Sequence, residues 1–170
     1  MSLIPALSAL ESDPNPLAQD QLRRIQAILA EKPVIPGIIE RLVATMNTDG
    51  GYDWVNPNVT DANFPTVTEP SLEGARLDKI VGSRQYVLAE LKRLGRRAAN
   101  AAELLLYGVK NPEEQRKYWI WALAQVWVDP DSRYEYAVVL DVGDDGKRNA
   151  DLLGVAVDVN AVERVLSFPL

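Results

Sequence analysis

The sequence contains neither cysteine nor histidine. Without cysteine, the chain has no disulfide framework and no thiolate metal site. Without histidine, it lacks the commonest general base, the commonest metal ligand and every Ser-His or Cys-His catalytic arrangement. Carboxylates, lysine, tyrosine and backbone amides are the groups left for catalysis. We therefore expect a protein that is not an enzyme, with no catalytic residues, no cofactor and no bound metal.

Long apolar runs are also missing. No stretch approaches the ~20 apolar residues of a membrane-spanning helix, and the first ten residues lack the basic region that opens a signal peptide. Lys and Arg number 18 against 24 Asp and Glu, a net charge of −6. An acidic chain of this kind has no overall attraction for nucleic acid or for an anionic bilayer. We expect neither as a partner.

The chain has 170 residues, of which 47% are hydrophobic and 25% charged, as is typical of one globular domain. We expect an N-terminal arm at 1–14, followed by a single domain over 15–170. Apolar residues at helical spacing predict helices at about 16–31 and 36–46.

A long loop is expected at 47–70, where Asn, Asp, Gly, Pro and Thr replace the periodic apolar pattern. The loop contains Tyr52, Trp54 and Phe64. These rings can anchor the loop on its own core. They can also anchor a neighbouring subunit, because aromatic side chains are enriched at the centres of interfaces.

Helical spacing predicts three further helices, at about 71–94, 98–107 and 112–127. In the last of these, Trp119 and Trp127 suit one apolar face, but Trp121 lies about 200° around the helix from Trp119. Either this helix is buried on two sides, or the side that carries Trp121 meets another protein.

After residue 132 the apolar period changes from 3.6 to 2, which predicts strands at 134–142 and 153–159. Turn residues at Gly143–Gly146 join them into an antiparallel hairpin. A short helix is expected near 160–166. The predicted fold class is α+β, with a helical N-terminal two-thirds followed by a C-terminal antiparallel β-hairpin and a short helix.

The most basic cluster in the sequence consists of Lys92, Arg93, Arg96 and Arg97. In the last turn of a helix these residues complement the helix dipole. They can instead bind phosphate or an acidic partner surface. A separate pair of carboxylates, Asp141 and Asp158, could face each other across the hairpin and form an acidic site.

The C-terminal half carries Gly82-Ser83-Arg84 before a helix, the Trp-bearing helix at 112–127, and Asp129-Pro130-Asp131 leading into the two strands. In these features it resembles the wedge proteins of contractile-phage baseplates. The resemblance implies a structural virion component that packs a helix–hairpin unit against neighbouring subunits. It also implies a location in the host cytoplasm and then in the virion.

We therefore expect a structural subunit of a large multi-protein assembly, such as a phage tail, baseplate or neck, which is multimeric in context and acts through protein–protein contacts. A small cytosolic regulatory binding module is the alternative, and a histidine-free enzyme that uses Asp141 and Asp158 is a third hypothesis. The residues expected at interfaces are Tyr52, Trp54, Phe64, Trp121, Arg93, Arg96 and Arg97.

Overall fold

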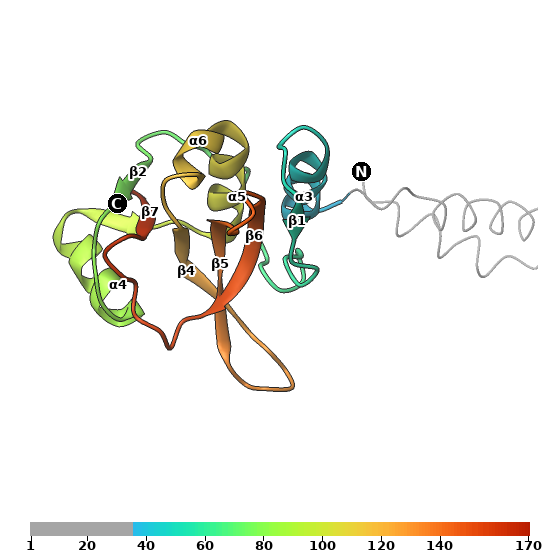
Figure 1. Ribbon diagram of the computed structural model, residues 1–170. Helices are drawn as coiled ribbons and strands as arrows, with labels where there is room; N and C mark the ends of the chain where they lie inside the picture. Colours follow the sequence, from blue (N-terminus) through green and yellow to red (C-terminus); the bar gives the residue numbers. More distant parts are fainter. Residues whose placement is uncertain (1–35) are drawn as a thin grey trace, which may run out of the picture. The chain divides into compact units, whose positions relative to one another are not determined.

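A mixed sheet forms the centre of the computed structural model, which describes residues 36–170 (Figure 1). Its seven strands are β1 Trp54–Val55, β2 Arg76–Asp78, β3 Arg96–Ala98, β4 Ile120–Val128, β5 Glu135–Val142, β6 Arg148–Gly154 and β7 Arg164–Pro169. Their order across the sheet is β1-β6-β5-β4-β7-β2, and β3 also pairs with β7. The arm predicted at 1–14 and the helix predicted at 16–31 lie outside the described residues.

Helices cover both faces of this sheet. The helices of the described part are α3 Ile38–Thr48, α4 Arg84–Arg93, α5 Ala101–Lys110 and α6 Pro112–Gln115. Residues of α3 and α5 pack on one face against a core that includes Ile120, Val138 and Leu140. Residues of α4 pack on the other face against Trp121 and Val139. The central strands are therefore buried on both sides.

Local capping explains where the two longer C-terminal helices begin. Asn100 Oδ1 accepts a hydrogen bond from Glu103 N at 2.9 Å, and Glu103 Oε2 accepts one from Asn100 N at 2.9 Å. This reciprocal pair is a capping box, which satisfies two backbone donors at the start of α5. At the start of α4, Ser83 Oγ accepts a hydrogen bond from Tyr86 N at 3.3 Å, which is a single N-cap without a return bond.

The predicted fold class is wrong, because the sheet rather than the helices dominates the described chain. The helix expected at 112–127 ends at Gln115 as α6, and β4 begins at Ile120. The first part of β4, Ile120–Leu123, is buried on both faces, and its sequence is apolar on both faces too. A continuous apolar run of this kind fits a buried helix and a doubly buried strand equally well.

Three further segments differ from the predictions. The helix expected at 71–94 contains β2, and only its second half is helical, because Gly82-Ser83 separates the two. The second strand is Arg148–Gly154 rather than 153–159, and the helix expected near 160–166 is replaced by β7. The predictions at 36–46, 98–107 and 134–142 lie close to α3, α5 and β5.

Arg148, at the start of β6, joins elements that are distant in the sequence. The residue is only 3% exposed. Its Nη1 donates to Gly50 O at 2.5 Å, and its Nη2 donates to Gly108 O at 2.8 Å and to Gln115 Oε1 at 3.2 Å. Gly50 follows the C-terminus of α3 and Gly108 lies in the last turn of α5. Carbonyl groups at helix C-termini carry partial negative charge, so they suit a buried cation.

Tyr52 and Gln115 belong to the same buried network, in which Arg148 Nε has no hydrogen-bond partner among residues 36–170. The Arg148 guanidinium lies 4.2 Å from the centroid of the Tyr52 ring, and the Tyr52 hydroxyl donates to Gln115 Oε1 at 2.5 Å. Burial raises the pKa of Tyr52, so the hydroxyl remains a donor. A Cβ atom at Gly108 would lie 2.1 Å from the Tyr52 hydroxyl oxygen. The close approach of α5 to Tyr52 therefore requires glycine at this position.

Replacing Arg148 with methionine should lower the free energy of unfolding by about 3 kcal/mol or more. The substitution leaves Gly50 O and Gly108 O without their guanidinium donor, while Gln115 Oε1 keeps the Tyr52 hydroxyl, and an unsatisfied buried acceptor costs ~1–3 kcal/mol. Urea unfolding followed by tryptophan fluorescence measures this change.

The matched control is Arg116→Met, because the Arg116 side chain is half-exposed and forms only an i,i+3 ion pair with Glu113. Exposed pairs of this type contribute ~1 kcal/mol or less. Equal unfolding midpoints for the two variants would show that the Arg148 network does not stabilise the fold.

Candidate functional site

Strands β4 and β7 are paired at the start of β4 and separate where β3 lies between them. Strand β4 pairs with β7 only at Ile120 and Trp121. Beyond this point Ala99, which follows β3, donates to Leu166 O of β7 at 2.8 Å and accepts from Ala124 N of β4 at 3.0 Å. The register of β4 against β5 shifts between Ala122 and Trp127. A bulge of this type bends a strand, so the outer part of β4 turns away from the rest of the sheet.

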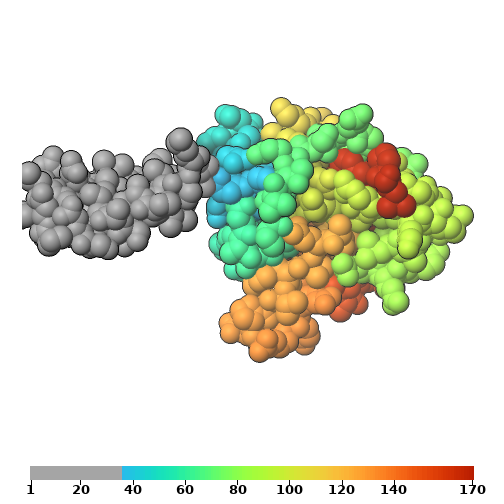
Figure 2. Space-filling model, turned by 180° about the vertical axis from the view of Figure 1, so that it is seen from behind, coloured from blue at the N-terminus to red at the C-terminus, as the bar shows by residue number. Residues whose placement is uncertain are grey.

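Residues 126–136, here called the projecting hairpin, form the outer part of β4, the turn and the start of β5. In Figure 1 this segment extends beyond the helices, and in Figure 2 it forms a separate lobe. Two large apolar side chains of the segment are exposed, Val128 by 48% and Tyr134 by 66%. The projecting hairpin therefore places apolar surface in solvent.

One edge of the projecting hairpin is an uncovered strand edge. Asp129 N donates to Tyr134 O at 3.0 Å, toward β5. Successive residues of a strand direct their backbone groups to opposite edges, so those of Val128 point away from β5. Within residues 36–170, no strand pairs with β4 on that side beyond Trp121. Uncovered edges of this kind are sites where another chain can add a strand.

The turn at the tip is held by its own side chains. Asp129 Oδ1 accepts from Asp131 N at 3.1 Å, and Asp129 Oδ2 accepts from Ser132 Oγ at 2.6 Å. Arg133 has φ +64° and closes the turn, with its N donating to Asp129 O at 2.9 Å. The hydrogen bond from Ser132 is the main cause that lowers the pKa of Asp129, and the Asp131 amide adds to it.

Two hollows flank the projecting hairpin. One, of about 460 Å³, lies between the hairpin and Asn56 and Asn58, and its aromatic wall is the pair Trp127–Tyr136, with ring centroids 5.8 Å apart. The other, of about 640 Å³, lies between the hairpin and residues 153–157. Both hollows share Tyr136, so each is bounded by the same hairpin.

Three of the four aromatic interface candidates are buried within the chain itself. Tyr52 and Phe64 belong to the core on the α3 and α5 face. Trp121 is in the core on the α4 face, and its Nε1 donates to Glu163 Oε2 at 2.9 Å. Trp54 differs, because 44% of it is exposed. The sequence left open whether these rings pack within their own fold or contact another protein. Tyr52, Phe64 and Trp121 pack within their own fold.

The three arginine candidates make separate local contacts. Arg93 pairs with Glu90 on the exposed side of α4, with Nη2 and Oε1 2.7 Å apart. Arg96 Nε donates to Ser167 Oγ at 2.7 Å. Arg97 pairs with Glu103 at 2.6 Å and lies over the ring of Phe168. Arg96 and Arg97 thus tie β3 and α5 to β7, and a contact with a partner protein stays a prediction for all three.

The expected pairing of Asp141 with Asp158 does not form. Because β6 begins at Arg148, the residue opposite Asp141 is Asn149, whose Nδ2 donates to Asp141 Oδ1 at 3.0 Å. Asp158 follows the end of β6 and is exposed. Across residues 36–170, no group of three or more carboxylates is placed to hold a metal ion.

The sequence analysis missed the projecting hairpin because it placed Trp127 in a helix. It interpreted residues 129–132 as the turn between that helix and a strand. One signal was present in the sequence: the turn residues Asp129-Pro130-Asp131-Ser132 stand between two segments rich in aromatic and β-branched residues, as the turn of a hairpin does.

No family model, curated protein or solved structure matches this chain. In the described part of the chain, none of the helices is both long enough and apolar enough to cross a bilayer. Functional inference therefore starts from the geometry of the projecting hairpin.

Acidification should loosen the tip of the hairpin before it unfolds the chain. The pKa of Asp129 is lowered below its ordinary value of 3.8, so the carboxylate stabilises the turn above pH 3.8. This contribution is lost as the pH falls through the lower pKa of the folded state. The Asp131 amide donates to Asp129 Oδ1, and the Tyr134 amide donates to Ser132 Oγ, which itself donates to Asp129 Oδ2. Hydrogen exchange of these two amides, corrected for its intrinsic pH dependence, should therefore show reduced protection below this pKa.

Asp129→Asn should show reduced protection of the same two amides already at neutral pH. Asp144→Asn, in the turn between β5 and β6, is the matched control and should leave them unchanged. Identical exchange in wild type and Asp129→Asn would show that the carboxylate does not hold the turn.

Proposed function

We propose that this protein is a contact-forming subunit of a multi-protein assembly, and that its projecting hairpin receives an extended segment of a neighbouring subunit. The observation that carries the proposal is the uncovered edge of β4 at exposed Val128. An added strand would take its hydrogen bonds from the backbone of β4 and cover the Val128 side chain. This is recognition by β-strand addition.

The end of this edge lies beyond the protection that the rest of β4 has. Natural edge strands are commonly shielded by lysine, proline, a bulge or a covering loop. The bulge of β4 ends before Trp127, so Val128 lies beyond it, and the nearest proline, Pro130, lies beyond the strand in the turn. An exposed apolar residue on an open edge is therefore better explained by a partner strand than by an isolated subunit.

The phage tail, baseplate or neck remains a prediction for the kind of assembly. The resemblance to baseplate wedge proteins was based partly on a helix at 112–127, and this segment is mainly strand β4. Support for a contact-forming role therefore comes from the hairpin itself and not from that resemblance. A regulatory module with one partner is the alternative, which stoichiometry distinguishes.

Substituting Val128 with lysine should release the chain from its assembly. The substitution places a charge on the open edge and disfavours pairing with another strand. We expect full-length wild-type protein from its native cells to sediment in a particle larger than a one-to-one complex. Val128→Lys should reduce the particle-bound fraction about tenfold and increase the free fraction.

Val162→Lys is the matched control, because Val162 is 71% exposed and lies in the connection before β7, outside the hairpin. It should sediment as wild type does. A discrete one-to-one or two-to-two complex would support the regulatory module instead. Equal sedimentation of both variants would contradict a role for the β4 edge.

A further inference from the structure

At the opposite end of the same strands, four side chains from four segments form one row across the sheet. The pairing of β5 with β6 places Asp141 opposite Asn149, and the pairing of β1 with β6 places Trp54 beside Asn149. Trp121 pairs with Val139, so Trp119, two residues earlier, stands opposite Asp141. We call the row Trp119–Asp141–Asn149–Trp54 the polar strip.

All four side chains belong to the sheet face that carries α4. Residues alternate between faces along a strand. Trp121 and Val139 are in the core on that face, so Trp119 and Asp141 point to the same side. Val55 packs on the other face, which places Trp54 on the side of the strip. With neighbouring strands ~4.8 Å apart, the backbones at the two tryptophans are about 14 Å apart.

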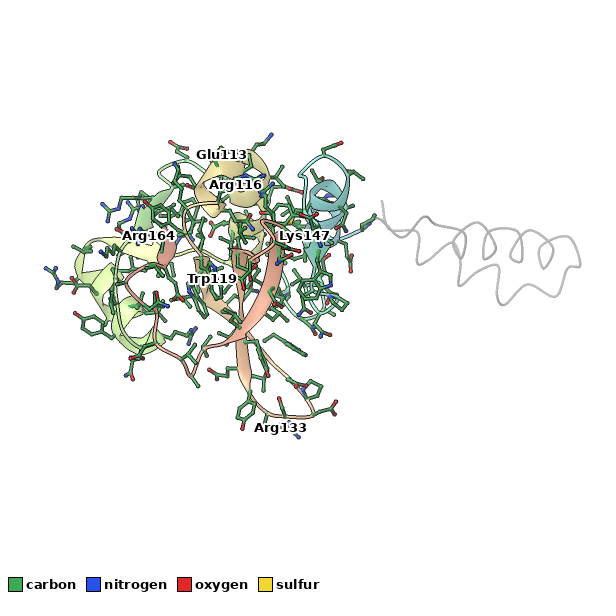
Figure 3. All side chains as sticks on the ribbon, viewed as in Figure 1. Glu113, Arg116, Trp119, Arg133, Lys147 and Arg164 are labelled. Carbon is green, nitrogen blue, oxygen red and sulfur yellow. The ribbon has the colours of Figure 1, made fainter. Side chains whose placement is uncertain are left out.

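Aromatic rings at both ends of the strip are open to solvent. Trp119 is 42% exposed and Trp54 is 44% exposed. Figure 3 labels Trp119 among the side chains on the sheet. An exposed tryptophan offers a flat apolar surface and a ring face that attracts cations. Trp119 and Trp54 stand at the two ends of the row, and the surface between them is about as long as a short peptide segment.

Two carboxylates lie at the strip, Asp141 between the rings and Asp151 two residues after Asn149, and neither has a cationic partner among the described residues. Asp141 is 8% exposed, and its Oδ1 accepts only the hydrogen bond from Asn149. Its neighbour on β6, Asp151, accepts at Oδ1 from Asn56 Nδ2 at 2.9 Å. Among residues 36–170, neither carboxylate lies within ion-pair distance of a lysine or arginine. Asp141 Oδ2 accepts no hydrogen bond from these residues.

The Asp141 and Asp151 carboxylates carry the same charge and lie close together, so their site attracts a cation. Burial raises the pKa of Asp141, and the negative charge of Asp151 adds to the rise. A positive group bound here would offset both effects, because it is attracted to both carboxylates. Charge complementarity therefore favours a cationic occupant over a neutral or an anionic one.

We infer that the polar strip binds an arginine or lysine side chain on a basic segment of a partner protein. Asp141 Oδ2 and the Asp151 carboxylate accept hydrogen bonds from the guanidinium or ammonium group. Trp119 and Trp54 pack against the aliphatic stems and cationic heads of neighbouring basic residues. The strip lies at the end of the sheet opposite the projecting hairpin, so it is a second and separate contact site.

A titration of the full chain with a hexa-arginine peptide tests the inference. The indole NH signals of Trp54 and Trp119 in ¹H–¹⁵N spectra, assigned with single Trp→Phe variants, should shift on addition of the peptide. Added salt should weaken the binding, because charge pairs at a partly exposed site are screened. The double variant Asp141→Asn, Asp151→Asn should bind about tenfold more weakly, as expected for the loss of two such pairs.

The matched control is Asp131→Asn, Asp158→Asn, which removes the same charge from two exposed positions elsewhere and should bind as wild type does. If the first double variant fails to fold, Trp54→Ala at the edge of the sheet should still weaken binding. Equal affinities for the two double variants would overturn the inference. So would shifts of the same indole signals by hexa-glutamate or by a neutral oligosaccharide in place of the arginine peptide.

Discussion

The described part of the chain depends on one buried cation. Arg148 begins β6, and its guanidinium reaches the C-terminal ends of α3 and α5 as well as Gln115 of α6. A guanidinium can serve these acceptors together because its donors are arranged in a rigid fork. The contact fixes β6 against the helices, and through the pairing of β6 with β5 and β1 it sets the register of half the sheet. That register brings Trp54, Asn149 and Asp141 into one row.

A second constraint is the entry of β3 between β4 and β7. A strand that lost β7 as its neighbour without compensation would expose its backbone groups along its whole outer half. Ala99 satisfies Ala124 N, Arg84 Nε donates to Leu123 O at 3.0 Å, and Gln125 Nε2 donates to Pro65 O at 2.9 Å. The bulged part of β4 is thus held by its surroundings, and only the segment beyond it is left open. The projecting hairpin is consequently a rigidly based element with a free edge.

The two ends of the central strands therefore present different chemistry. The projecting hairpin offers apolar side chains and unpaired backbone, which are general features that accept many extended sequences. The polar strip offers the Asp141 carboxylate between two tryptophans, with Asp151 beside it, and these charges favour a cationic partner. A subunit that binds one neighbour through backbone pairing and another through charge would be held in a defined orientation. The contact-forming role proposed for this chain requires two such sites, one for each neighbour.

Local chemistry along the sequence was sufficient to place several elements. Apolar residues at helical spacing located α5, alternation located β5, and the glycines of Gly143–Gly146 located the turn before β6, because these signals act over a few residues. The absence of histidine and cysteine likewise restricted the available chemistry from composition alone. The secondary structure of 120–123 was decided by tertiary structure, since an apolar run buried on both faces has no period that separates strand from helix. The same holds for Arg148 and for the row of Trp54, Asn149, Asp141 and Trp119: their members are far apart in sequence, and only the strand register and the helix ends that surround them bring them together.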